Sequence, residues 1–274
     1  MKIALTGAGG MLGRDIVRVF GDVELIALTS AVLDVTSRDA VITVMKDIRP
    51  DVIIHAAAYT DVDLAESEPE KAYLVNGTGT RNMAMASDEL RCPIVYISSD
   101  YVFDGTKKGP YHEWDPTCPV NRYGLSKLMG EQFVTSLTNR YFIVRTSWLY
   151  GRNGKNFVNT ISRYLDERES LSVVDDQRGC PTFTIDLAAK LRELIGKGYG
   201  TYHITNSGDC SWYEFARKIA DLRGSGTKII PVTSDNFPRP AKRPSNSVLG
   251  NTMLRLEGLE PARRWEEALA EYLA

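Results

Sequence analysis

The sequence predicts an α/β fold in which helices cover both faces of a doubly wound parallel sheet, with a smaller C-terminal α/β lobe. A glycine-rich turn at 7–13 follows the first apolar run, at 2–5, and precedes a helical pattern. From there to about residue 146, apolar runs of strand length alternate with helix-length segments. This alternation is typical of βαβ units, whose strands pair in parallel. Beyond residue 150 the helices become shorter and loops more frequent, which indicates the second lobe.

Composition and charge argue against several classes of protein. Hydrophobic residues make up 43% and charged residues 25% of the 274 positions, as in ordinary globular domains. The net charge is −2 without a long run of one sign, so we expect neither nucleic-acid nor membrane-surface binding. No apolar stretch approaches the roughly 18 residues of a membrane span, and we expect no signal peptide. The scattered cysteines favour a reducing cytoplasm and argue against a zinc site. They are Cys92, Cys118, Cys180 and Cys210.

The glycine-rich turn has the context of a dinucleotide-binding site. Gly7, Gly10 and Gly13 form G-x-x-G-x-x-G between a strand and a helix. The first permits a tight turn, the second lets the backbone approach a pyrophosphate, and the third allows close packing of helix and strand. The helix N-terminus adds N–H groups and a partial positive charge. We therefore predict a Rossmann-type cofactor site in which Met11 and Leu12 also contact the dinucleotide.

The second strand, expected at 24–28, ends without the carboxylate that often binds the adenosine ribose. Thr29 and Ser30 stand there instead, and their hydroxyls can accept a 2′-phosphate that an acid would repel. The cofactor is therefore predicted to be NADPH, with use of NADH left open. Asp34 is interpreted either as an acceptor for the adenine amino group or as a turn residue. Together with Val35, it is assigned to the cofactor site.

The third and fourth strands are expected at 51–58 and 93–98, on either side of a long helix from 69 to 90. An earlier helix is expected to begin after Ser37, whose side chain can cap it. The third strand ends in small side chains, which allow a flat cofactor to lie against the backbone. These residues are also assigned to the cofactor site: Ala56, Ala57 and Ala58.

The fourth strand leads to a hydroxyl, and the next helix carries a tyrosine and a lysine. Ser99 lies at the carboxyl end of its strand, where open α/β sheets bind ligands. Tyr123 and Lys127 are four residues apart and share one helix face. An ammonium beside the phenol would lower the phenol's pKa from about 10 and prepare it to protonate a carbonyl oxygen. The tyrosine–lysine pair alone is weak evidence, which the fingerprint and the strand-end serine strengthen.

A fifth strand at 141–145 completes the expected first domain. Residues 1–150 are predicted to form a dinucleotide-binding domain, and 151–274 mainly a substrate-binding lobe. Segments from about 183–205 are expected to return to the first domain.

Longer motifs resemble the dTDP-4-dehydrorhamnose reductase family of extended short-chain dehydrogenases/reductases. They are AAAYTDVD at 56–63, AESEPE at 65–70, DYVFDG at 100–105, RTSWLYG at 145–151 and RPSNS at 243–247. The resemblance extends from residue 1 to about 270. It implies that NAD(P)H reduces the 4-keto group of dTDP-4-dehydro-β-L-rhamnose to give dTDP-L-rhamnose.

The resemblance also implies residue roles. Tyr123 would be the proton donor, and Lys127 would bind the nicotinamide ribose and tune the phenol. Ser99 would take the third catalytic place, where close relatives usually have threonine, and would contact the substrate. The sugar pocket would be lined by three more residues: Asp100, Tyr101 and Trp148.

A substrate with two phosphates needs cationic partners, and a guanidinium group suits phosphate geometry. Arg243, in a proline-rich segment, is therefore assigned to the substrate, with Gln177 and Thr182 as weaker candidates. Some family members bind magnesium at a dimer interface, and Asp15 lies near one such position. We find no complete set of ligands and predict no metal. The resemblance implies a monomer or a homodimer.

Two other interpretations stay open. The chain could be another nucleotide-sugar enzyme of this scaffold, such as a different 4-keto reductase, an epimerase or a dehydratase. A dehydratase would need an acid/base pair, and no glutamate follows Asp100. Alternatively, it could be a non-catalytic NADP-binding regulatory subunit, like the beta subunit of methionine adenosyltransferase. The intact Ser99, Tyr123 and Lys127 argue against that role.

Overall fold

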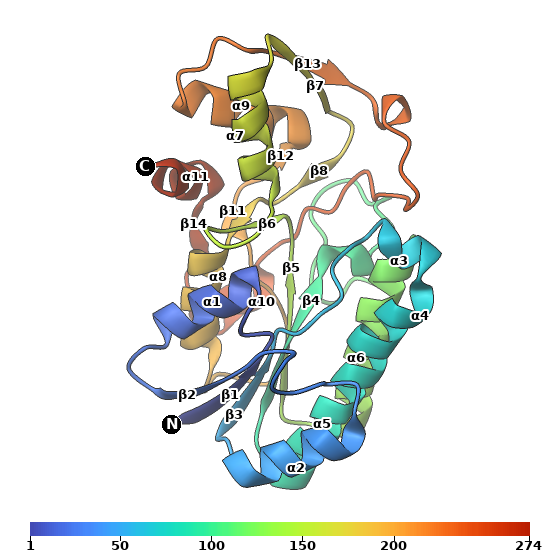
Figure 1. Ribbon diagram of the computed structural model, residues 1–274, viewed down its shortest axis with the longest axis vertical. Coiled ribbons are helices and arrows are strands. Elements are labelled where there is room, and N and C mark those ends of the chain that lie inside the picture. Colours follow the sequence, from blue (N-terminus) through green and yellow to red (C-terminus); the bar gives the residue numbers. More distant parts are fainter.

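Six parallel strands form the central sheet of the computed structural model, which describes residues 1–274 (Figure 1). Their order is β10-β5-β4-β3-β1-β2. The chain moves outward from β1 to β2 and then resumes on the other side of β1, so the order reverses between β1 and β3. Open α/β sheets bind ligands at such a reversal, beyond the carboxyl ends of the strands. The strands are β1 (Lys2–Thr6), β2 (Glu24–Leu28), β3 (Val52–His55), β4 (Ile94–Ser99), β5 (Tyr141–Thr146) and β10 (Gly200–His203).

Alternate side chains of the strands enter two apolar layers, because successive residues of a strand point to opposite faces. Ile3 and Leu5 pack with residues of α1, α8 and α10, whereas Ala4 packs with residues of α2, α5 and α6. Figure 1 shows the two groups of helices on opposite faces of the sheet. They are α1 (Met11–Val19), α8 (Thr184–Leu194), α10 (Thr252–Leu256), α2 (Arg38–Ile48), α5 (Thr80–Leu90) and α6 (Arg122–Leu137).

The helix predicted from 69 to 90 is present but irregular. It begins as α4 (Pro69–Ala72), continues as a π-helical segment, η1 (Tyr73–Gly79), and ends as α5. A short helix, α3 (Leu64–Ser67), precedes it. Asn76 and two glycines lie in the π-helical turns, and π-helical turns are frequent at functional sites. The cap predicted at Ser37 is confirmed, since its hydroxyl accepts from the Ala40 N–H.

The C-terminal half builds a second apolar core above the sheet. Tyr150, Phe183, Phe215 and Trp265 are buried at its centre. Not every segment after residue 150 belongs to this lobe, because β10 pairs with β5 and α8 packs on α1. No helix combines the length and the hydrophobicity needed to cross a membrane. The elements of the lobe are β6 (Leu149–Tyr150), α7 (Phe157–Glu167), β7 (Ser170–Val174), β8 (Arg178–Gly179), β9 (Thr182–Phe183), β11 (Asn206–Ser207), β12 (Cys210–Ser211), α9 (Trp212–Leu222), β13 (Lys228–Val232), η3 (Ser234–Asn236), β14 (Ala262–Arg264) and α11 (Trp265–Leu273).

Candidate functional site

The glycine turn lies at the point where the strand order reverses. Gly7 follows β1 with φ +74°, a left-handed conformation that favours glycine. A Cβ on Gly7 would lie 2.5 Å from the Ala57 nitrogen, and a Cβ on Gly13 would lie 2.1 Å from the Gly7 oxygen. Gly10 caps α1 without a side-chain hydrogen bond. The first N–H groups of α1 therefore lack a side-chain acceptor, which fits a pyrophosphate at this helix end.

Replacement of Gly13 by alanine should disrupt this turn. The added Cβ would overlap the Gly7 oxygen, so α1 must move away from β1. We expect a loss of about 1–3 kcal/mol in the free energy of unfolding and weaker NADPH binding. Thermal unfolding and fluorescence titration with NADPH measure the two effects. Gly226→Ala is the control, because a Cβ on Gly226 meets no atom within 4 Å. Equal behaviour of the two variants would contradict the prediction.

The structure brings most of the predicted cofactor residues to this turn. Thr29 lies beside it, with its methyl group 3.6 Å from where a Cβ on Gly9 would stand. The backbone of Ala56 and Ala57 abuts Gly7. Of the remaining predicted residues, Leu12 is buried, whereas Met11 and Ala58 are partly accessible.

Asp34 shows a turn role in this structure. Its carboxylate accepts hydrogen bonds from the N–H and the hydroxyl of Thr36, at 2.9 and 2.7 Å. Val35 is buried, and its side chain packs against the position of Gly79. A contact of either residue with adenine stays a prediction.

The start of α6 packs directly against the end of β4. The Asn121 side chain caps α6 by accepting from the Gly124 N–H at 2.7 Å. A Cβ on Gly124 would lie 2.0 Å from the Tyr101 oxygen, so only glycine allows this approach. The rings of Tyr101 and Tyr123 meet edge to face, with centroids 5.8 Å apart. The Ser99 hydroxyl lies near enough to the Tyr123 phenol to favour the ionised phenol. The structure thus brings Ser99 and Tyr123 together as predicted.

The pKa of Tyr123 differs from the expectation. Burial raises the pKa of Tyr123 to about 12, the Ser99 hydroxyl opposes this rise, and the Asp100 charge adds to it. Lys127 is not among the groups that shift it, and its ammonium lies over the Tyr96 ring, 4.4 Å from the centroid. Burial lowers the pKa of Lys127 to about 7, against the favourable charge of Glu131. The predicted lowering of the phenol pKa is therefore wrong, since burial outweighs the neighbouring hydroxyl.

A buried ion pair joins α6 to β5. Glu131, one turn after Lys127, accepts from both the Nε and an Nη of Arg145 on β5, at 2.9 and 2.7 Å. Ser98 donates to the same carboxylate at 2.6 Å. Both charged side chains are at most 7% exposed. Sequence reasoning missed this pair, although an arginine inside an apolar strand run was a signal for it.

Asn76 is a second residue that sequence reasoning missed. Its amide donates to the Tyr59 carbonyl and to the Ser126 hydroxyl, both at 2.9 Å, and accepts from the Tyr59 N–H at 2.8 Å. It thereby joins the π-helical segment, the loop after β3 and α6. No sequence signal marked it, because a lone asparagine in a helical stretch is usually exposed.

Trp148 is held in an uncommon conformation beside the sheet edge. Its φ is +47°, and its indole stacks on Trp212 with centroids 3.4 Å apart and planes 5° apart. Gly179 packs against the same indole, where a Cβ would lie 2.4 Å away. Strained backbone of this kind costs about 1–3 kcal/mol and is concentrated at functional sites. The structure therefore gives Trp148 a fixed orientation.

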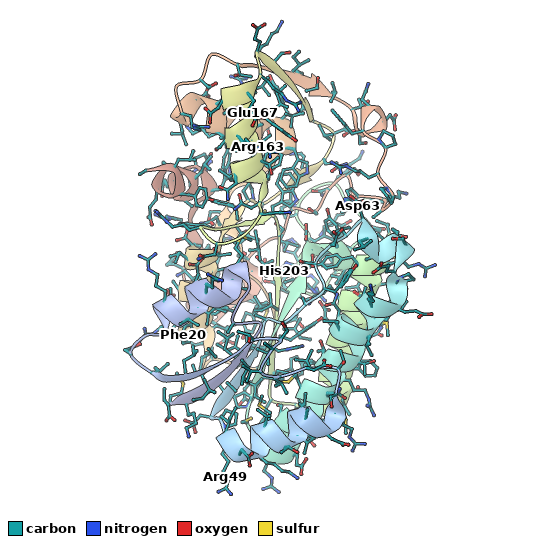
Figure 2. The ribbon with its side chains drawn as sticks, in the orientation of Figure 1. Phe20, Arg49, Asp63, Arg163, Glu167 and His203 are labelled. Carbon is teal, nitrogen blue, oxygen red and sulfur yellow. The ribbon has the colours of Figure 1, made fainter.

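The other predicted substrate residues differ in whether their side chains are free to bind a ligand. Thr182 is buried, and its hydroxyl donates to the Cys180 carbonyl at 3.1 Å, so it is poorly placed to bind a ligand. Gln177 is partly accessible. Arg243 donates to the Asp63 carboxylate at 2.7 Å, and Arg239 lies 3.6 Å from the same carboxylate. Figure 2 labels Asp63 next to α3, where the segment from the upper lobe descends.

Comparison with known proteins places the chain in a family. A family model described as the RmlD substrate binding domain matches residues 1–274. The chain belongs to this family. The spore coat polysaccharide biosynthesis protein SpsK of Bacillus subtilis is 41% identical over 99% of this chain and 96% of its own length. A dTDP-4-dehydrorhamnose reductase of Burkholderia thailandensis is 40% identical over 93% and 92% of the two chains.

A solved structure agrees closely with this member of the RmlD family. Bacillus anthracis dTDP-4-dehydrorhamnose reductase, in complex with NADP, has a TM-score of 0.97 and 45% identity and covers 100% of this chain and 99% of its own. The predicted family and the predicted α/β fold with a Rossmann-type parallel sheet are therefore confirmed.

Proposed function

We propose that this chain catalyses the NADPH-dependent reduction of dTDP-4-dehydro-β-L-rhamnose at its 4-keto group, giving dTDP-L-rhamnose. The convergence of Ser99 and the Tyr123–Lys127 helix at the sheet edge, in a chain of the RmlD family, carries this proposal. The relative from Burkholderia thailandensis is named for this activity, and the Bacillus anthracis structure holds NADP. NADPH is favoured because Thr29 stands where an acid would repel a 2′-phosphate. NADH is retained as a second donor.

Separate residues are proposed to bind the cofactor and to donate the proton. The glycine turn and the uncapped N-terminus of α1 would hold the pyrophosphate, and Lys127 the nicotinamide ribose. When bound, NADPH supplies the hydride. Tyr123 is proposed to give its phenol proton to the C4 oxygen as negative charge develops there. A half-buried phenol with a high pKa keeps its proton at neutral pH, which suits a proton donor.

Arg243 is proposed to bind a phosphate of the substrate, which requires Arg243 to exchange its contact with Asp63 for the phosphate. Asp100, Tyr101 and Trp148 are proposed to line the sugar pocket. Tyr101 occupies the position after Asp100 where a dehydratase would need glutamate, and its ring contacts Tyr123. This arrangement favours a reductase over a dehydratase.

A coupled assay tests the proposal. Enzymatically generated dTDP-4-dehydrorhamnose is supplied with NADPH or with NADH, and cofactor oxidation is followed together with the sugar product. We expect one NADPH oxidised per dTDP-L-rhamnose formed, and a lower kcat/KM with NADH. Conversion of the keto sugar to an isomer without net cofactor oxidation would instead indicate an epimerase. Absence of turnover on any keto sugar would favour the regulatory-subunit alternative. A cytoplasmic location and a monomeric or homodimeric state stay predictions.

A further inference from the structure

The hydrogen bonds of Ser99 limit what its hydroxyl can do. A serine hydroxyl has one proton to donate and two lone pairs that can accept. Ser99 Oγ donates its proton to Asp100 Oδ1 at 2.8 Å and accepts from the Tyr101 N–H at 3.1 Å. An ionised carboxylate can only accept, so the proton between these two residues must belong to Ser99. In this state Ser99 cannot donate to a substrate carbonyl oxygen.

The second oxygen of Asp100 has no partner. Asp100 Oδ2 is buried and forms no hydrogen bond, and the whole residue is 3% exposed. Burying an unpaired carboxylate oxygen is unfavourable for the ionised acid, which has lost its hydration. A neutral acid loses much less hydration when it is buried. The position therefore favours the neutral acid more than a solvated aspartate does.

We propose that Asp100 is a positioning residue whose neutral acid form donates to Ser99 and turns the Ser99 proton toward the reacting oxygen. When Asp100 carries the proton, its O–H donates to Ser99 Oγ, and the Ser99 proton is released from the carboxylate. When Asp100 is ionised, it captures the Ser99 proton again. No proton leaves Asp100 during the reaction, since Tyr123 supplies the proton that the substrate gains. This inference rests on the proposed reductase function.

The surroundings of Asp100 set the pH range over which this carboxyl group gains or loses its proton. Burial raises the pKa of Asp100 to about 7, while the nearby hydroxyls of Ser247 and Ser99 and nearby backbone N–H groups oppose the rise. The titratable groups that face it are Tyr101 on η2 (Asp100–Val102), Tyr123 on α6 and Cys180 between β8 and β9. Burial raises the pKa of each of these three groups, so they are neutral near pH 7 and leave Asp100 to titrate there.

The test compares Asp100→Asn with wild type, first with Ser99 present and then with Ser99→Ala in both enzymes. The asparagine amide can donate to Ser99 at every pH, whereas Asp100 loses its proton as the pH rises through about 7. From pH 6 to pH 8 the neutral fraction of such an acid falls about tenfold. We therefore expect the kcat ratio of Asp100→Asn to wild type to rise about tenfold over this range. With Ser99→Ala in both enzymes, the ratio should be independent of pH. The ratio cancels the titration of Lys127, which both enzymes share.

The proposal would be overturned if the kcat ratio of Asp100→Asn to wild type did not change with pH. It would also be overturned if this ratio rose equally when both enzymes carry Ser99→Ala. Asp47→Asn, on the exposed surface of α2, is the matched control and should give a constant ratio. If Asp100→Asn fails to fold, Ser99→Ala alone gives the answer. Its deficit relative to wild type should shrink between pH 6 and pH 8, and a constant deficit would refute the switch.

A second measurement does not depend on turnover. Infrared difference spectra of the purified protein should contain a carboxylic acid C=O band that titrates near pH 7 and is missing from Asp100→Asn. Absence of this band would overturn the proposal even in an active reductase. Presence of the band in a protein without reductase activity would refute the proposed function and leave the state of Asp100 established.

Discussion

Replacement of Tyr123 by phenylalanine is expected to lower kcat about 10²–10⁴-fold. The variant removes the proton that Tyr123 is proposed to give to the substrate oxygen, while the ring keeps its edge-to-face contact with Tyr101. We expect little change in NADPH affinity or thermal stability, because the phenol makes no hydrogen bond that holds two elements together. Steady-state kinetics with the keto sugar separate kcat from KM.

Tyr164→Phe is the control, because it removes a phenol hydroxyl from a tyrosine outside the candidate site. Tyr164 lies on α7 in the upper lobe, where its ring packs under Arg163 and Arg168. Its removal should leave kcat within about twofold of wild type, since surface substitutions away from the site have small effects. Near-normal turnover by Tyr123→Phe would show that another group protonates the substrate.

Replacement of Arg145 by methionine should destabilise the protein by about 3–5 kcal/mol, because it leaves the buried Glu131 carboxylate without its cation. Ser98 still donates to Glu131, but one neutral hydrogen bond does not replace a bidentate guanidinium. Urea unfolding followed by circular dichroism measures the change in the free energy of unfolding.

The double variant Glu131→Gln with Arg145→Met provides the control. Removing both charges should recover most of the loss, since the cost arises from the unpaired carboxylate rather than from the missing contact. A double variant as unstable as Arg145→Met would contradict this explanation. The two variants also report on Lys127, because the Glu131 charge favours its ammonium form and holds its pKa up.

The sheet and the fingerprint could be predicted because their signals are local. Five of the six parallel strands coincide with apolar runs, and β10 lies inside a segment that was expected to return to the first domain. The interruption of the long helix by η1 could not be predicted, because it depends on bonds between Asn76 and the loop at Tyr59.

Part of the candidate site could also be predicted from local signals. One helix fixes the spacing of Tyr123 and Lys127, and the end of one strand fixes the position of Ser99. The partner of Arg243 was not predictable, since Asp63 lies 180 positions away in the sequence. The shift of the Tyr123 pKa was also missed, because burial is a property of the assembled fold and not of the residue spacing.

The contact between Arg243 and Asp63 has a mechanical consequence. It fastens a late segment of the chain to the loop that follows β3 and leads into α3. Any hinge movement that swings the upper half away from the sheet must first part these two side chains. Exchange of Arg243 from Asp63 to a phosphate would therefore remove one of several bonds that hold this segment, because the Ala241 N–H still donates to Asp63 and Asn121 still donates to the Lys242 carbonyl.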